Sequence, residues 1–268
     1  MKFSIYQASR IGDRKYNQDR VAYAYSDQAL LLVLADGMGG HSHGELAAQL
    51  AIQTFIKAFE ETTQTGISNP SNFLNLVMQN AHNAIIRYTR EQKLNGNPGT
   101  TCVAAVVVDD QIFWAHAGDS RLYLIREGNV VARTKDHSVV QQWADSGMIE
   151  TKNMRTHPDR NKITNCLGAE EGMFFVDSSA AQLLQKNDYI ILCSDGLWGP
   201  LSGQEIASTL NLSPLPLPQV LEQLMDRAIE KEAGHSDNIT VVGIHWGKSD
   251  EMRITTMPVA MMLDCEQV

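Results

Sequence analysis

The chain has 268 residues and a formal net charge of −9, and 43% of its residues are hydrophobic. This length and composition allow a sizeable buried core in one large domain or two small ones. The acidic balance argues against nucleic-acid binding through a basic surface, and it fits a site made of carboxylates. The first residues, MKFSIYQASR, lack the apolar segment of a signal peptide, and no stretch is long enough to span a bilayer. We therefore expect a cytoplasmic protein that binds neither nucleic acid nor membrane, and we expect it to be a monomer.

Cysteine occurs without paired spacing, at Cys102, Cys166, Cys193 and Cys265. Cys102 and Cys193 lie in apolar runs that are typical of strands. The pattern predicts reduced residues of the core rather than disulfides or zinc ligands.

The first part of the chain predicts three strands before any helix. These strands cover residues 3–10, 21–25 and 29–35, with turns at Gly12-Asp13 and Asp27-Gln28. The third strand contains LLLVLA, an unbroken apolar run that predicts burial on both faces.

Two helices are expected next. From Ser42 the apolar residues recur with a helical period, and residues 66–70 break the pattern. Ser71 is expected to cap a second helix that ends before Asn95. Because each helix has one apolar face, the pair needs a sheet to cover.

The second part of the chain returns to strands, at residues 100–108, 112–116, 121–125 and 130–133. A short helix is expected to start at Asp136 or Ser138. The polar stretch that follows predicts a flap, about residues 137–165. Val176 belongs to a possible edge strand, and further strands at 189–193 and 239–246 enclose helices at 203–210 and 219–232. We assign residues 1–247 to one domain, and we expect the tail, 248–268, to be loosely ordered.

Strands gathered around helical pairs, rather than alternating with single helices, favour an α+β fold with antiparallel sheets. We expect two such sheets packed face to face, each with a helical pair on its outer face, which gives a four-layer αββα sandwich.

Four acids share one context, because Asp36, Asp119, Asp195 and Asp237 each stand at the end of an apolar strand beside Gly, Ser or Asn. If these carboxylates converge, each close pair costs on the order of a few kcal/mol at an effective dielectric near 20. The pattern then implies bound divalent ions or strongly raised pKa values. The alternative is that each Asp only begins or ends a turn.

The stretch from Asp36 to His41 reads DGMGGH, in which glycines let the backbone turn and approach a ligand closely. The carboxylate of Asp36 and the carbonyl of Gly37 are oxygen donors that suit Mg²⁺ or Mn²⁺. An ordinary turn from strand to helix, with Asp36 as a helix cap, would give the same residues.

Several short motifs occur in one order along nearly the whole chain, from about Arg10 to Trp246. They are RxxNQD from Arg14, DGMGGH from Asp36, GTT from Gly99, GDSR from Gly118, DHS from Asp136, SDGLW from Ser194 and DNIT from Asp237. In this order the chain resembles the metal-dependent protein serine/threonine phosphatases of the type 2C family, and most of all the compact bacterial members.

The resemblance implies an αββα sandwich with two Mn²⁺ or Mg²⁺ ions in the cleft between the sheets. Asp36 would bridge the ions, Asp195 and Asp237 would bind the first, and the Gly37 carbonyl would bind the second. Asp19 would hold metal-bound water from outside the coordination shell. Asp119, with Asp195 nearby, resembles the site of a third, weaker ion.

The resemblance also implies the reaction, which is hydrolysis of phosphoserine and phosphothreonine by in-line attack of a hydroxide that bridges the two metals. Arg14 matches the arginine that binds the substrate phosphate. The substrates would be phosphorylated proteins, made by a serine/threonine kinase. The alternatives are a metal-binding module that recognises phosphopeptides without turnover, and a phosphodiesterase or other small-molecule phosphohydrolase.

The sequence departs from the family pattern at two positions. Met38 stands where many members have a His that is thought to protonate the leaving group, which leaves metal-bound water, His41 or His43 as the acid. Gln18 replaces a frequent Glu, so Asp19 is the main acid outside the coordination shell.

Other motif residues have structural interpretations. We expect His116 and Trp198 to be packing residues, and Asp136 and His137 to fix the start of the flap. His157 and Arg160 either touch the substrate or lie on a solvated loop.

Overall fold

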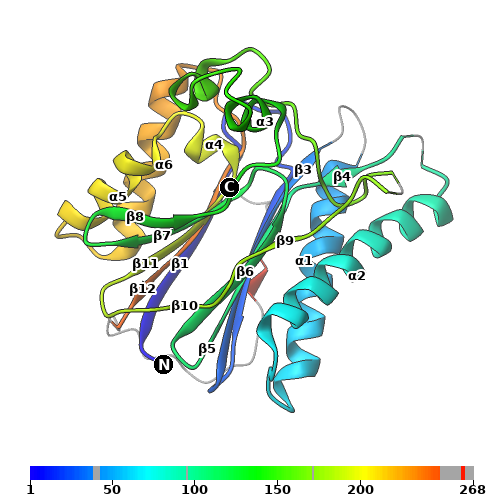
Figure 1. The fold of residues 1–268 in the computed structure, drawn as a ribbon, viewed down its shortest axis with the longest axis horizontal. Coiled ribbons are helices and arrows are strands. Elements are labelled where there is room, and N and C mark those ends of the chain that lie inside the picture. The colour runs from blue at the N-terminus through cyan, green and yellow to red at the C-terminus, as the bar shows by residue number, and fades with distance from the viewer. Residues whose placement is uncertain (39–42, 95, 171, 248–260, 263–268) are drawn as a thin grey trace.

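The structure is a computed structural model that describes residues 1–38, 43–94, 96–170, 172–247 and 261–262. Two antiparallel sheets pack face to face between two layers of helices (Figure 1). The predicted α+β fold and αββα layering are therefore confirmed. In the described ranges no helix has both the length and the apolar character needed to cross a membrane.

The first sheet has five strands, each antiparallel to its neighbour. In order across the sheet they are β1 (Phe3–Arg10), β12 (Ile239–Trp246), β11 (Tyr189–Cys193), β7 (Arg121–Arg126) and β8 (Asn129–Arg133).

The second sheet is larger and is also antiparallel throughout. Its order is β10 (Gln182–Leu183), β6 (Gln111–Ala117), β5 (Cys102–Val108), β3 (Ala29–Met38), β2 (Asp19–Tyr25) and β13 (Met261–Met262), while β4 (Gly99–Thr100) pairs with β3 and β9 (Asp177–Ser178) pairs with β6.

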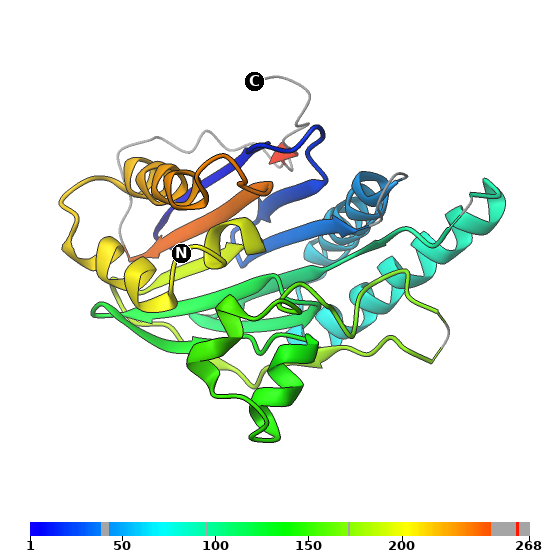
Figure 2. The ribbon, with the colours of Figure 1, turned by 90° about the horizontal axis from the view of Figure 1, so that it is seen from above.

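A helical pair covers the outer face of each sheet, as Figure 1 shows on its two sides. The larger sheet is covered by α1 (Gly44–Thr63) and α2 (Pro70–Glu91), and the smaller sheet by α5 (Gly203–Leu212) and α6 (Leu217–Glu232). The segment between β8 and β9 contains α3 (Val139–Asp145) and the 3₁₀ helix η1 (Thr151–Thr156), and it projects on one side of the sandwich (Figure 2). The four-residue α4 (Asp195–Trp198) follows β11.

The apolar run in β3 is buried on both faces, as the sequence predicts. Leu31 and Val33 face α1 and α2, whereas Leu30, Leu32 and Leu34 face the other sheet. Because successive side chains of a strand point to opposite faces, a strand between two apolar layers needs apolar residues at every position.

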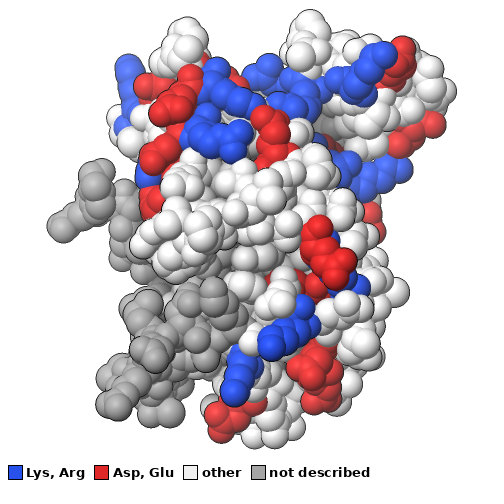
Figure 3. Space-filling view, turned by 90° about the vertical axis from the view of Figure 1, so that its left-hand side faces the viewer, with Lys and Arg blue, Asp and Glu red and all other residues white. Residues whose placement is uncertain are grey.

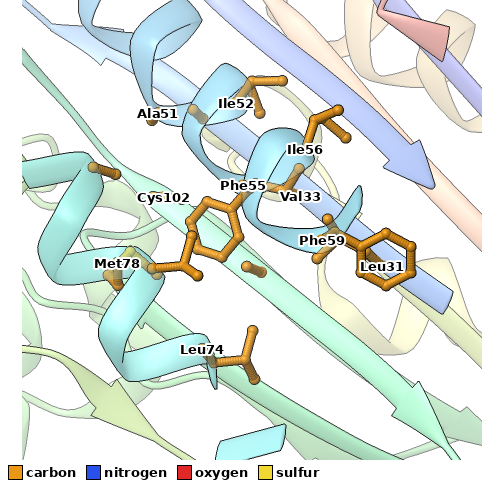
Figure 4. Close-up of a cluster of buried hydrophobic side chains, with 14 of the residues drawn as sticks. Leu31, Val33, Ala51, Ile52, Phe55, Ile56, Phe59, Leu74, Met78 and Cys102 are labelled. Atoms are coloured by element: carbon orange, nitrogen blue, oxygen red, sulfur yellow. The ribbon is translucent and has the colours of Figure 1, made fainter. Parts of the chain in front are cut away.

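Aromatic residues of α1 fill the layer between the helices and the larger sheet. Phe55 and Phe59 are fully buried and lie over Leu31 and Val33, with Met78 of α2 beside them (Figure 4). This rigid packing supports β3, the strand that ends near Asp36.

Some predicted boundaries are wrong for local reasons. Asn69, not Ser71, caps α2, because its side chain accepts a hydrogen bond from the Asn72 backbone N–H at 3.0 Å and Pro70 occupies the first helical turn. The strand expected over 100–108 is interrupted at Thr101, whose backbone N–H bonds to the Asp36 carbonyl at 2.8 Å.

The sequence analysis missed α4 and the short edge strands β10 and β13. The edge strand near Val176 begins one residue later, at Asp177. Ser138 caps α3, as expected. Cys102 and Cys193 are buried free thiols, as predicted, and Cys166 is a free thiol but only half-buried, while Cys265 lies outside the described residues. Most of the tail, and Gly39, Gly40, His41 and Ser42, also lie outside them.

Candidate metal centre

Strand ends from both sheets bring the predicted acids to one end of the sandwich. Asp19 and Asp36 stand directly opposite each other on β2 and β3 of the larger sheet. Asp195 follows β11 and Asp237 precedes β12, both in the smaller sheet, and Asp119 lies on the connection from one sheet to the other. In Figure 1 the labels of α4 and β3 mark this end of the two sheets.

Asp19 and Asp36 are the innermost pair. Asp19 is fully buried and accepts a hydrogen bond from the Ser194 hydroxyl at 2.8 Å, and burial raises its pKa to about 6. Burial, followed by the charges of Asp19, Asp195, Asp119 and Asp237, holds the pKa of Asp36 well above its usual range. Part of Asp36 stays accessible, so its carboxyl can meet a ligand from the cleft.

Asp119 and Asp195 complete the cluster on the other side. Burial and the charge of Asp136 raise the pKa of Asp119 to about 7. Burial and then the charges of Asp119, Asp237 and Asp19 raise the pKa of Asp195 well above its usual range. Since each carboxyl disfavours ionisation of the others, the cluster lacks sufficient positive charge of its own.

Arg14 stands at the mouth of the cluster. Its Nη2 donates to Oδ2 of Asp237 at 2.6 Å, while 58% of its side chain surface is exposed. The other oxygen of Asp237 accepts from the Asn238 backbone N–H at 2.8 Å. Most of the guanidinium fork therefore remains available to a ligand in solvent.

Hydroxyl groups fix the backbone around Asp36. The Thr100 hydroxyl donates to the Asp36 carbonyl at 2.9 Å, and the Asp36 backbone N–H donates to the Thr101 hydroxyl at 3.1 Å. The Thr101 and Ser120 hydroxyls lie 2.6 Å apart, which ties the Asp36 strand to the turn that carries Asp119. The GTT and GDSR motifs thus meet in the structure.

Gly37 is required by close packing rather than by an unusual backbone angle. It continues β3, and its φ is not positive, in contrast to the sharp turn expected at this residue. A Cβ at this position would lie 2.3 Å from the carbonyl oxygen of Gly44, at the start of α1. The strand end and the helix start can therefore approach only if residue 37 is glycine.

A buried cation lies beneath the cluster, and the sequence analysis did not identify it. Arg121 donates from Nε and Nη2 to both oxygens of Asp136, at 2.8 and 2.6 Å, and from Nη1 to the Tyr123 hydroxyl at 2.9 Å. Its guanidinium carbon lies 3.6 Å from the centre of the Trp198 ring. Asp136 is therefore an ion-pair partner, and Trp198 is a packing residue as expected.

His116 and His137 are stacked beside Asp119. Their rings are 4.5 Å apart and within 15° of parallel, and Asp177 lies 3.8 Å from Nε2 of His137. Among the described residues, these three form a group whose possible metal-ligating atoms all lie within 4.8 Å of one another.

The histidine pair does not make a metal site. Nδ1 of His137 accepts hydrogen bonds from the Gly118 backbone N–H at 3.1 Å and from the Asn165 amide at 2.9 Å, so Nε2 carries the proton and has no lone pair for a metal. The lone pairs of nearly parallel rings also do not converge on one point. His137 instead joins the start of the segment between β8 and β9 to the Gly118 turn.

The aspartate cluster fits divalent cations better than the histidine pair does. It offers only oxygen donors, which Mg²⁺ and Mn²⁺ prefer, and the carboxyls repel one another in a buried setting. Asp36, Asp195, Asp237 and the backbone of Gly37 are the candidate ligands, with Asp119 as a further one.

Of the two histidines offered as general acids, the structure describes His43. His43 begins α1 in the left-handed conformation, with φ of 84°, and Met38 ends β3. His157 and Arg160, which were expected to touch the substrate or to lie on a solvated loop, are in the segment between β8 and β9. His157 packs edge-on against Trp143 and accepts from the Asp159 backbone N–H at 3.1 Å, whereas Arg160 is exposed. None of these contacts assigns an acid.

Comparison with known proteins identifies the class. The model of the family described as protein phosphatase 2C matches residues 6–237, and the chain belongs to this family. A putative protein phosphatase 2C-type from Streptococcus pyogenes is 30% identical over 247 residues, covering 91% of this chain and 97% of that protein.

Solved structures agree with this assignment. A serine/threonine phosphatase of S. agalactiae is similar with a TM-score of 0.80 and 30% identity, covering 91% of this chain and 99% of that one. The catalytic domain of the serine threonine protein phosphatase PstP, solved in complex with 2 manganese ions, is similar with a TM-score of 0.75 and 28% identity, covering 91% and 97%.

Proposed function

We propose that this protein is a metal-dependent phosphatase that hydrolyses phosphoserine and phosphothreonine in proteins. The observation that carries the proposal is the cluster of acids that strand ends of both sheets bring together, with the exposed Arg14 hydrogen-bonded to one of them, Asp237. Membership of the protein phosphatase 2C family favours this activity over a module that binds phosphopeptides without turnover.

The proposed mechanism assigns the acids to two ions. Asp36 would contact both ions, Asp195 and Asp237 one of them, and the Gly37 carbonyl the other. When bound, two divalent cations would lower the pKa of a water between them and so provide a nucleophile near neutral pH. Asp119 is the proposed ligand of a third, weaker ion.

Other residues act on the substrate and on the solvent. Arg14 would place two guanidinium N–H groups on the phosphate oxygens, which orients the phosphorus for in-line attack and stabilises charge as it develops. Asp19, fully buried behind Asp36, would accept a hydrogen bond from water at the ions and fix its orientation. No side chain needs to act as a nucleophile in this scheme.

The finer parts of the proposal concern the cell. We propose Mn²⁺ or Mg²⁺ as the metal, phosphorylated products of a serine/threonine kinase as substrates, and the cytoplasm as the place of action. We further propose that the protein acts as a monomer, with residues 137–165 forming a flap beside the cleft.

The proposal is tested with purified protein, Mn²⁺ and a phosphothreonine peptide. We expect hydrolysis that stops with a chelator and returns with added Mn²⁺, and we expect Asp237→Asn to lose at least about 100-fold in kcat because the ligand charge is removed. Asp27→Asn is the matched control, since Asp27 lies in an exposed turn between β2 and β3.

Binding experiments separate the alternatives. Calorimetry should show tight Mn²⁺ binding to wild type and to Asp27→Asn, and weakened binding to Asp237→Asn. Wild-type protein that binds Mn²⁺ and phosphopeptide without releasing phosphate would refute the enzyme and support the recognition module. Faster hydrolysis of nucleotides than of phosphopeptides would support the small-molecule phosphohydrolase instead.

A further inference from the structure

The loop between β1 and β2 carries Arg14, and it is fastened to the loop that carries Asp237. Asp13 and Ser236 form the main link, although they are far apart in the sequence. The Asp13 backbone N–H faces the carbonyl and the hydroxyl of Ser236, at 3.0 and 3.1 Å. In return, Oδ2 of Asp13 accepts from the backbone N–H and from the hydroxyl of Ser236, both at 2.8 Å.

The two partners differ in exposure. Asp13 is exposed, whereas Ser236 is 1% exposed. A carboxylate that accepts from a backbone N–H and a hydroxyl makes charge-assisted hydrogen bonds, which are stronger than neutral ones. Asp13 therefore anchors an otherwise exposed loop to a fixed point in the fold.

Two neighbouring residues close the loop further. Gly12 adopts φ of +61°, and a Cβ there would lie 2.1 Å from the Asp237 carbonyl oxygen, so the two backbones are in contact. The Asn238 amide donates to the carbonyls of Ile11 and Tyr16, at 2.8 and 3.0 Å. Both ends of the loop are thus held by the segment 236–238, with Arg14 between them.

Arg14 itself has little else to fix it. Its side chain is 58% exposed, and it donates a hydrogen bond to Asp237, which belongs to the segment 236–238 that holds the loop. A long side chain with this exposure samples many rotamers unless its backbone is held. The position of the guanidinium therefore depends on the clamp at Asp13.

We propose that Asp13 is a positioning residue for phosphate recognition, which it serves by holding the Arg14 loop against Ser236 at the edge of the metal cleft. The inference rests on the proposed function of Arg14. The ligand of Arg14 is the phosphate group of the substrate or free inorganic phosphate, and Asp13 does not contact this ligand.

The test uses Asp13→Ala and Asp13→Asn, with Asp27→Asn as the matched control. The readouts are KM and kcat for p-nitrophenyl phosphate, the inhibition constant of inorganic phosphate, Mn²⁺ affinity by calorimetry, and melting temperature. For Asp13→Ala we expect KM and the inhibition constant to rise by roughly 5- to 20-fold, because a misplaced binding group costs up to about 100-fold.

In the same variant we expect Mn²⁺ affinity to stay within about 2-fold of wild type, because the ligands of the metals are unchanged, while kcat also falls because the displaced Arg14 stabilises the transition state less well. Asp13→Asn keeps an oxygen acceptor for Ser236, so it should recover most of the phosphate affinity. A residue with a purely structural role would lower the melting temperature and Mn²⁺ affinity together, and that result would overturn the inference.

A double-mutant cycle with Arg14→Ala gives the sharpest readout. Asp13→Ala should have no further effect on phosphate inhibition when Arg14 is absent, since the two residues act as one unit. If Arg14→Ala alone leaves phosphate inhibition unchanged, the proposed function of Arg14 fails. If Arg14→Ala weakens phosphate binding and Asp13→Ala does not, or if the two effects simply add, the inference about Asp13 fails while the proposed function stands.

Discussion

Replacing Arg121 by methionine should destabilise the fold strongly, because it leaves the buried Asp136 carboxylate without its main partner. The side chains of Arg121 and Asp136 are only 9% and 3% exposed, and they share two short hydrogen bonds. Breaking a buried ion pair by removing one partner costs about 3–5 kcal/mol. Arg133 remains 3.6 Å from Asp136, so we expect a value near the lower end, about 3 kcal/mol.

Urea unfolding measures the loss in the free energy of unfolding, and the melting temperature should fall by roughly 6–12 °C. Arg121→Met combined with Asp136→Leu should recover more than half of the loss, because no unpaired charge stays buried. Lys57→Met is the control, since Lys57 and Glu61 form an exposed pair 4.0 Å apart and should contribute less than about 0.5 kcal/mol. A loss below about 1 kcal/mol for Arg121→Met, or a double variant as unstable as the sum, would refute the reasoning.

Three further predictions concern the pKa of Glu205, the burial of Phe55 and the close packing of Gly37. Hydrogen bonds from Lys231 and Ser202 lower the pKa of Glu205 from 4.5 to about 2, so its stabilisation is present above pH 4.5 and disappears as the pH falls toward 2. The difference in melting temperature between wild type and Glu205→Gln should therefore shrink over that range, and a constant difference would contradict this. Phe55→Ala should cost about 3–5 kcal/mol in urea unfolding and Phe55→Leu clearly less, since the ring is fully buried; equal losses would contradict the packing. Gly37→Ala should weaken Mn²⁺ binding in calorimetry by roughly 10-fold or more, because its Cβ would meet the Gly44 carbonyl; wild-type affinity would contradict this.

The strands and helices were predictable where the hydrophobic pattern and the turn or capping residues at its ends agree. The strands at 189–193 and 239–246 match β11 and β12, because each is an apolar run bounded by turn residues. The start of α2 was not, because Ser71 and Asn69 are both good caps and only the neighbouring Pro70 favours the earlier one. Two-residue strands such as β10 carry no periodic signal at all.

The acids of the cleft were predictable because each follows or precedes an apolar strand. The sequence could not show the contacts that position these acids, because the contacts join segments far apart in the chain. The bidentate pair of Arg121 and Asp136 and the clamp of Asp13 on Ser236 depend on side-chain geometry, which no spacing rule encodes. The resemblance supplied roles for motif residues, and Asp13 stands just before the first motif, which begins at Arg14.

The contacts of Arg14 and Arg121 explain why the acid cluster remains negative. Arg121 lies within the protein, but both oxygens of Asp136 occupy its guanidinium, and Asp136 raises the pKa of Asp119 more than Arg121 lowers it. On the face shown in Figure 3, basic and acidic side chains lie interspersed at the upper end rather than forming one basic field. Arg14 is therefore free to bind a phosphate beside the acid cluster. The negative charge of the buried acids remains uncompensated, so it can bind divalent cations. If Arg121 paired with the acids of the cluster instead, they would bind divalent cations less well. The pairing of Arg121 with Asp136 prevents this.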